Sequence, residues 1–178
     1  MPVSFLSQAQ RERYGRYSGD LTSDALARYF HLDDADRSAI ADKRGDHNRL
    51  GFALQLTTVR FLATFLEDPT AVPAPVLSSL RRQLALSGGV EDYAHAEQRW
   101  VHAEQIRTSY GYLPFTEPAA GFRLTRWLYA QCWTGTEQPS VLFDRATTWM
   151  LAHRVLLPGA SVLERFVARL RERVEAHL

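Results

Sequence analysis

Cysteine and long hydrophobic runs are both scarce in this sequence. Cys132 is the single cysteine, so no disulfide can form within the chain, and nothing indicates secretion. No apolar run approaches the roughly 20 residues that a membrane-spanning helix needs. The N-terminal residues MPVSFLSQAQRERYGRY also lack the apolar core of a signal peptide. We therefore expect a soluble, cytoplasmic protein with no membrane partner.

Lysine is almost absent as well. Lys43 is the only lysine among the 21 basic residues, and all the others are arginine. Arginine forms bidentate hydrogen bonds with phosphate and carboxylate groups, which favours an anionic partner. The net charge of +1 gives no support to a polyanion partner when the chain is taken as a whole. A GC-rich coding sequence would produce the same bias toward arginine, so the composition leaves both explanations open.

Signatures of catalysis and of metal binding are missing. The sequence has no phosphate-binding glycine loop, no nucleophile elbow and no paired histidines of a zinc protease. The acidic run DDAD at residues 33–36 lacks the glycine and bidentate glutamate of a calcium loop and is typical of the first turn of a helix. His95 and His102 are not spaced as a zinc-binding i,i+4 pair, which favours structural or surface roles. Cys132 is typical of a small core residue. We expect no enzyme activity, metal or cofactor.

The pattern of polar and apolar residues predicts an all-α fold, a multi-helix bundle. β-branched residues rarely alternate with polar ones, so no sheet is indicated. Ser7, Thr22 or Ser23, and Asp33 are expected to begin helices, and basic residues followed by Gly45 are expected to end the third. Asp46 is expected to cap the next helix, which would run to about Leu66. Further helices are expected over residues 75–86, 94–110, 117–134, 139–154 and 161–177.

One proline-rich segment interrupts this series of helices. Residues 67–75 read EDPTAVPAP, with three prolines and no periodicity. We interpret this segment as a linker or a rigid connection. It divides the chain into possible subdomains over residues 1–68 and 74–178.

The stretch KRGDHNRLGFALQLTTVRFL, residues 43–62, combines positive charge with a chain reversal in front of an apolar helix. It predicts a helix-turn-helix-like unit. The first turn of the second helix would offer free backbone N–H groups and the positive end of a helix dipole to a phosphate. Lys43, Arg44 and Arg49 lie at the same end. The alternative is a solvated surface on which Arg44 and Arg49 pair with Asp42 and Asp46.

Three polar side chains further along this stretch are weaker candidates for DNA contact. Asn48 and Gln55 carry the amide groups that recognise adenine edges in the major groove. Arg60 lies eleven residues after Arg49 and returns to the same helical face. Arg81 and Arg82, beyond the proline-rich segment, could form a second phosphate-binding patch or a plain solvated face.

The same stretch resembles a signature of the N-terminal domain of Tn-three family replicative transposases, which reads close to R-R-G-x-x-N-R-L-G-F-A-x-Q-L-x-x-L-R. Two further segments are similar to conserved-looking blocks of that family, AEQRWVHAEQIRTSYGYLPF at residues 96–115 and HRVLLPGASVLERFV near the C-terminus, and the likeness covers essentially the whole chain. The chain departs from the family at an Arg-x-x-x-Arg pattern that often precedes the matching histidine. Arg99 is followed here by Trp100 and Val101, so no phosphate contact is expected from this pattern. The residues that match the first signature in register are Arg44, Gly45, Asn48, Arg49, Leu50, Gly51, Phe52, Ala53, Gln55, Leu56 and Arg60.

The resemblance implies an N-terminal domain, residues 1–178, that binds double-stranded DNA at the terminal inverted repeats of a transposon. In that family a metal-dependent acidic triad in a downstream domain cleaves and joins DNA, so this chain is expected to be non-catalytic. The expected contact residues are Lys43, Arg44, Asn48 and Arg49, with Gln55 and Arg60 as weaker members. The remainder of the transposase is the second expected partner, a homodimer is left open, and the bound protein would associate with the bacterial nucleoid.

A helical protein–protein docking module is the alternative function. Four tryptophans and seven tyrosines could anchor an interface, and the net charge near zero suits this function. The two functions differ in their response to salt. Each phosphate contact makes the affinity for DNA fall by about one order of magnitude for each tenfold rise in salt, whereas an aromatic docking groove is insensitive to salt.

Overall fold

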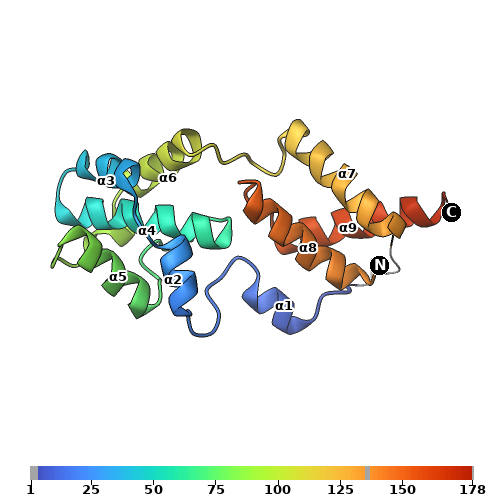
Figure 1. Cartoon of the computed structure of the whole chain (residues 1–178), viewed down its shortest axis with the longest axis horizontal. Helices are drawn as coiled ribbons and strands as arrows, with labels where there is room; N and C mark the ends of the chain where they lie inside the picture. Colours follow the sequence, from blue (N-terminus) through green and yellow to red (C-terminus); the bar gives the residue numbers. More distant parts are fainter. Residues whose placement is uncertain (1–3, 135–136, 178) are drawn as a thin grey trace. The chain divides into compact units, whose positions relative to one another are not determined.

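The computed structural model describes residues 4–134 and 137–177 and confirms an all-α fold (Figure 1). Within these residues the only β-type pairing is an isolated bridge between Leu113 and Val155, and there is no strand. The helical elements are α1 (Gln8–Arg13), α2 (Ser23–Tyr29), α3 (Asp34–Ala41), α4 (Asp46–Leu62), α5 (Ala74–Leu84), the 3₁₀ helix η1 (Glu91–His95), α6 (Gln98–Ser109), α7 (Pro118–Thr134), α8 (Pro139–Ala152) and α9 (Ala160–Glu175).

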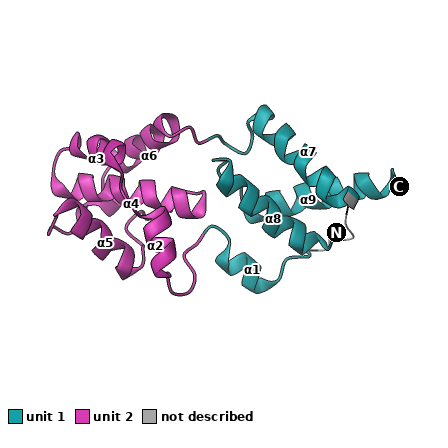
Figure 2. Ribbon diagram, in the orientation of Figure 1, with its two compact units in different colours: residues 1–15, 113–178 teal, residues 16–112 magenta. Residues whose placement is uncertain are grey.

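The chain forms two compact units (Figure 2). Unit 2 comprises residues 16–112 and contains α2 to α6, whereas unit 1 comprises residues 1–15 and 113–178 and contains α1, α7, α8 and α9. These boundaries differ from the division expected at the proline-rich segment. Residues 67–75 instead connect α4 to α5 inside unit 2, where the two helices pack against each other.

The expected helix starts are confirmed by side-chain caps. The hydroxyl groups of Ser7 and Thr22 accept hydrogen bonds from the backbone N–H groups of Gln10 and Ala25. Asp33 and Asp36 form a reciprocal capping box at the start of α3. Polar caps in the sequence therefore predicted these starts correctly.

Three helix boundaries differ from the expected ones. Gly45, with φ of +80°, rather than Asp46, precedes the first residue of α4 and provides no side-chain cap. That helix ends at Leu62 rather than near Leu66 because Ala63 adopts a left-handed conformation with φ of 55°. The helix expected over residues 94–110 begins only at Gln98, after the separate η1 helix.

The helix α4 forms the centre of unit 2 and contacts α2, α3, α5, α6 and η1. Its core residues include Leu50, Phe52, Leu54 and Leu56, all fully buried. Phe61 is half-buried and packs against three aromatic rings. Gly51 allows Tyr93 of η1 to pack directly on the helix, since a Cβ atom there would lie 2.4 Å from the Tyr93 ring.

Unit 1 has a separate core between α7, α8 and α9. Glu164 of α9 holds the N-terminal segment to this core, because its carboxylate accepts hydrogen bonds from the Ser4 hydroxyl and the backbone N–H groups of Phe5 and Leu6. Arg11 of α1 completes the arrangement with an ion pair of 2.8 Å to the same carboxylate.

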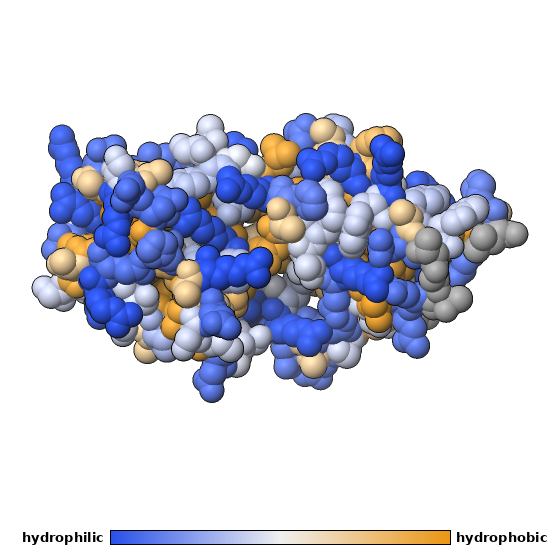
Figure 3. Space-filling view, in the orientation of Figure 1, coloured by the Kyte–Doolittle hydropathy of each residue, from blue (hydrophilic) through white to orange (hydrophobic). Residues whose placement is uncertain are grey.

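The surface shown in Figure 3 is mainly hydrophilic, with hydrophobic residues in small groups. Among the described residues, no helix has both the length and the apolar character needed to span a membrane.

Candidate nucleic-acid interface

The connection between α3 and α4 leaves a helix N-terminus with free donors. Gly45 adopts a left-handed conformation, which reverses the chain direction immediately before α4. The first backbone hydrogen bond of this helix runs from Arg49 N–H to the Gly45 carbonyl, at 3.1 Å. Over the described part of the chain, the N–H groups of residues 46–48 have no acceptor. These donors and the positive end of the helix dipole can bind an anion.

Arg44 is the most available cation at this turn. Its side chain is exposed, and within the described residues its guanidinium group has no hydrogen-bond or ion-pair partner. Its backbone carbonyl accepts a hydrogen bond of 2.8 Å from Asn48 Nδ2, which fixes the turn from which the side chain projects. The arrangement presents an exposed charge beside a hydrogen-bonded turn.

Lys43 and Arg49 are partly used to hold the turn together. The Lys43 ammonium lies 4.6 Å from the centre of the Phe52 ring and donates a hydrogen bond of 2.7 Å to Gln105 of α6. Arg49 Nε donates to the Lys43 carbonyl at 3.0 Å. Both side chains are half-buried, so they contribute positive potential from fixed positions.

Two carboxylates moderate the charge of this surface. Asp42 and Asp46 are both exposed and flank the basic residues. Arg49 Nη1 lies 3.7 Å from Asp46 Oδ1, which is a long contact between side chains that are 41% and 54% exposed. Such a pair contributes little to stability and exchanges readily for another anion. The alternative expected from the sequence, pairing of arginines with neighbouring aspartates, is thus present for Arg49 but not for Arg44.

Asn48 has a structural role at the turn. Its amide nitrogen bonds the Arg44 carbonyl, and its Oδ1 atom is covered and has no hydrogen-bond partner in the described structure. Reading an adenine edge needs both atoms of the amide group. This side chain therefore supports the contact surface in the conformation observed.

The side chain of Gln55 is only 5% exposed and does not reach the turn surface. Its amide nitrogen donates to the Tyr93 hydroxyl at 2.6 Å and to the Arg99 carbonyl at 2.9 Å. The same hydroxyl lies 2.8 Å from His102 Nδ1. Burial, together with the nearby charge of Lys43, lowers the pKa of His102 to about 4. Gln55 thus belongs to a buried polar network. Because it is buried, it does not lie on the surface with Lys43, Arg44 and Arg49.

Arg60 is likewise committed to the interior of unit 2. Its guanidinium group forms two hydrogen bonds of 2.7 Å with the carboxylate of Asp36, which is 1% exposed. The Tyr110 hydroxyl donates to the same carboxylate at 2.9 Å. Burial alone would raise the pKa of Asp36, but the hydrogen bonds and charge of Arg60, together with the hydrogen bonds from the Asp33 N–H and Tyr110, outweigh burial and lower the pKa. Arg60 therefore neutralises a buried acid and does not join the turn surface.

The other basic residues singled out in the sequence are also mostly occupied. Arg81 donates to the Gly88 carbonyl at 3.0 Å, whereas its neighbour Arg82 is exposed. Arg99 bonds the Ala94 carbonyl and lies over the Trp100 ring. No cluster of three or more histidine, cysteine, aspartate or glutamate side chains in the described residues could hold a metal ion.

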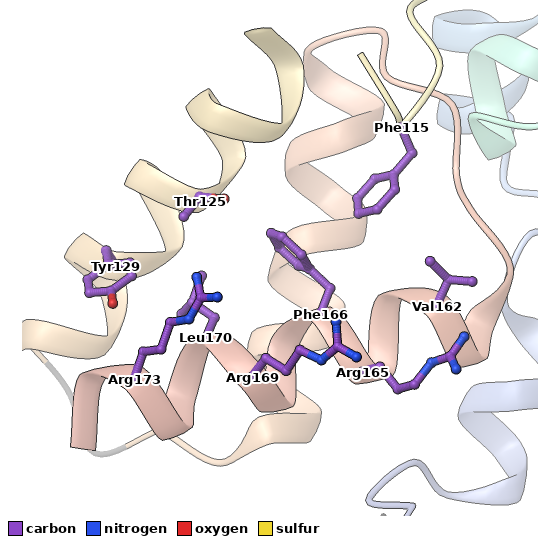
Figure 4. A pocket seen from close by; sticks show the side chains of 9 residues that line it. All are labelled: Phe115, Thr125, Tyr129, Val162, Arg165, Phe166, Arg169, Leu170 and Arg173. Carbon is purple, nitrogen blue, oxygen red and sulfur yellow. The ribbon is translucent and has the colours of Figure 1, made fainter. Parts of the chain in front are cut away.

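Sequence reasoning missed one cationic feature, which lies in unit 1. Arg165, Arg169 and Arg173 line a cleft between α7 and α9 (Figure 4). Their spacing of four residues could have indicated it, because residues four apart share one face of a helix.

Comparison with known proteins connects this chain to transposases. The family described as "Domain of unknown function (DUF4158)" matches residues 5–170. The chain is 44% identical, over its whole length, to the transposase for transposon gamma-delta from Escherichia coli (strain K12), of which it covers 18%. It is 30% identical to the transposase for transposon Tn501 from Pseudomonas aeruginosa, with 86% of this chain and 16% of that protein aligned. The transposase for transposon Tn21 from Escherichia coli is 31% identical over 91% of this chain.

These relatives are much longer than the chain described here. The chain spans less than a fifth of the length of the curated relatives that it matches. The shared part is the N-terminal region of those transposases. The chain therefore belongs to the DUF4158 domain family and is similar to the N-terminal region of Tn-three family transposases, as its motif predicted.

Proposed function

We propose that this chain binds double-stranded DNA at transposon terminal inverted repeats, as the N-terminal part of a transposase. The observation that carries the proposal is the start of α4, where free backbone N–H groups and the unpartnered Arg44 lie in the stretch that resembles the family signature. The names of the relatives, which are transposases for named transposons, support a DNA partner.

The α3–α4 turn offers two kinds of phosphate contact. Backbone donors at a helix N-terminus bind a phosphate oxygen directly, and exposed arginine adds charge-assisted hydrogen bonds. Lys43 and Arg49 add fixed positive charge beside them. These contacts would position the protein on the duplex, while recognition of base edges requires further groups. Gln55 and Arg60 support the surface from the protein interior.

The chemistry of transposition then belongs to another part of the parent protein. We infer no catalytic role for this chain, and its second partner would be the remainder of the transposase. If the parent transposase acts as a homodimer, a second copy of this chain would bind the opposite transposon end. Attachment to the remaining modules would raise the effective concentration of the DNA near this domain.

Docking of a protein partner is the second candidate, and exposed aromatic side chains favour it. Trp100, Phe122 and Trp133 are each more than 60% exposed. Aromatic residues of this kind anchor many protein interfaces. The response to salt separates this function from DNA binding, since burial of aromatic rings does not release counterions from a polyanion.

The test compares fluorescence anisotropy titrations of an inverted-repeat duplex from the parent element with a scrambled duplex, across a salt series. We expect tighter binding to the repeat, and a steep decrease in affinity for both duplexes as salt rises. Arg44→Ala should weaken binding to both duplexes, because a phosphate contact is independent of sequence. Arg28→Ala, which removes an exposed arginine from α2, is the matched control. Equal and weak binding to both duplexes would exclude sequence-specific recognition.

A further inference from the structure

The cleft between α7 and α9 in unit 1 has a volume of about 520 Å³ and a strongly cationic wall. Figure 4 shows Arg165, Arg169 and Arg173 following one another along α9, with Thr125 and Tyr129 of α7 on the opposite side. Phe115 and Phe166 also line the cleft, with ring centres 5.5 Å apart in an edge-on arrangement. The walls thus combine positive charge, hydroxyl groups and an apolar surface.

The three arginines form a regular row. A rise of 1.5 Å for each residue gives the row a length of about 12 Å along the helix. All three side chains are exposed. Arg165 Nε donates to the Ser161 carbonyl at 3.2 Å, whereas the guanidinium groups of Arg169 and Arg173 have no partner among the described residues. A row of exposed, parallel charges repels itself, so an anion that binds along it relieves this repulsion.

Acidic side chains do not offset the charge of this row. The cleft has no aspartate or glutamate among its described lining residues. On the same helix, Glu164 binds Arg11 and the N-terminal segment, and Glu175 pairs with Arg171 at 2.8 Å. Glu172 is exposed and does not line the cleft. The cleft therefore differs from the α3–α4 turn, where two aspartates lie among the basic residues.

We propose that this cleft is a second DNA-contact surface, which binds consecutive phosphates of one strand along the Arg165–Arg169–Arg173 row. This inference rests on the proposed function and extends it to a different unit of the chain. Repeated charges along one helix suit the repeated charges of a DNA strand. The hydroxyl group of Tyr129 can donate to a phosphate oxygen, and the two phenylalanines can pack against sugars. An acidic protein segment needs no such regular spacing, so DNA is favoured.

The experiment measures DNA binding by the 178-residue chain with both exposed, unpartnered arginines changed, Arg169→Gln together with Arg173→Gln. The expected result is weaker binding to repeat and scrambled duplexes alike, with the preference for the repeat retained. The slope of log affinity against log salt should decrease by about 1.8, which is about 0.9 for each lost phosphate contact. Arg169→Lys with Arg173→Lys, which keeps the charge, should restore most of this slope.

The matched control changes two exposed arginines of unit 1 that do not line the cleft, Arg13→Gln together with Arg126→Gln. This control loses the same charge, and circular dichroism melting would show that both double variants fold. If the cleft variant has the same affinity and slope as the control, while Arg44→Ala still weakens binding, the cleft inference is overturned and the proposed function stands. If the unchanged chain binds no duplex, the proposed function and the inference fail together.

Discussion

The first turn of α4 and its later turns carry similar polar residues in opposite environments. At the first turn, Arg44 is exposed and the N–H groups of residues 46–48 lack acceptors in the described structure. About two and four turns further on, Gln55 and Arg60 belong to the same sequence signature, yet both are bound within unit 2. Residues of one motif thus divide between an exposed turn and support of the fold.

This division follows from how α4 is packed. The helix is surrounded by other elements over most of its length, so a polar side chain there needs an internal partner. Gln55 bonds Tyr93, and Arg60 bonds Asp36. Just before the first turn, Arg44 is exposed and needs no internal partner. Burial, rather than residue type, separates the two roles.

The largest expected effect is on stability and comes from breaking the buried ion pair between Arg60 and Asp36. Arg60→Met leaves the Asp36 carboxylate, which is 1% exposed, without its bidentate partner. Removing one member of a buried ion pair costs about 3–5 kcal/mol of stability. We expect the free energy of unfolding in urea to decrease by that amount, with unchanged DNA affinity for the protein that remains folded.

An ion pair on the surface of unit 2 provides the control. Arg107 pairs with Glu104 across exposed positions of α6, so Arg107→Met should change the unfolding free energy little. If Arg60→Met destabilises the protein no more than this control does but weakens DNA binding, Arg60 belongs to the contact surface after all.

A smaller effect concerns the packing of Tyr93 on α4. In Gly51→Ala the new methyl group would lie 2.4 Å from the Tyr93 ring, which must shift together with its bonds to Gln55 and His102. Such overpacking costs about 1–3 kcal/mol, and urea unfolding would measure it. Gly121→Ala in α7 has no atom within 4 Å and should instead stabilise the helix, by about 0.5–1 kcal/mol. Equal effects of both changes would contradict the close packing of Tyr93.

The pH dependence of stability tests the burial of His102, which belongs to the polar network of Gln55 and Tyr93. His102 has a pKa of about 4 in the folded chain and an ordinary value near 6.5 when unfolded. The unfolded chain therefore binds the proton first, and stability decreases as pH falls from 6.5 toward 4, by at most about 1.4 kcal/mol for each pH unit. His102→Gln should reduce the loss of unfolding free energy between pH 7 and pH 5. His95→Gln, at an exposed position, should leave this loss unchanged. An identical pH dependence in all three proteins would show that His102 is accessible.

Local signals in the sequence predicted the helices well. Polar caps marked the starts of α1, α2 and α3, and the side chains expected to cap them do so. The end of α4 at Leu62 was harder to predict, because the left-handed Ala63 carries no sequence signal comparable to glycine.

Tertiary contacts limited the prediction of the candidate site. Nothing near Arg60 in the sequence indicates Asp36 as its partner, since the two residues lie on different helices. The same holds for Gln55 and Tyr93, and for the division of the chain into units, which pairs α1 with helices more than 100 residues away. Arg44 is the one residue whose place in the candidate site follows from local pattern alone, because it is exposed at the turn that Gly45 forms.

Amide hydrogen exchange at residues 46–48, with and without an inverted-repeat duplex, tests most directly whether DNA binds at the start of α4. In the free protein these amides lack acceptors in the described structure, so they should exchange rapidly. Saturating duplex is expected to slow their exchange, because phosphate oxygens accept their hydrogen bonds, while the buried amides of residues 50–59 remain unchanged. Rapid exchange of residues 46–48 in the presence of bound duplex would contradict the assignment of DNA to this turn.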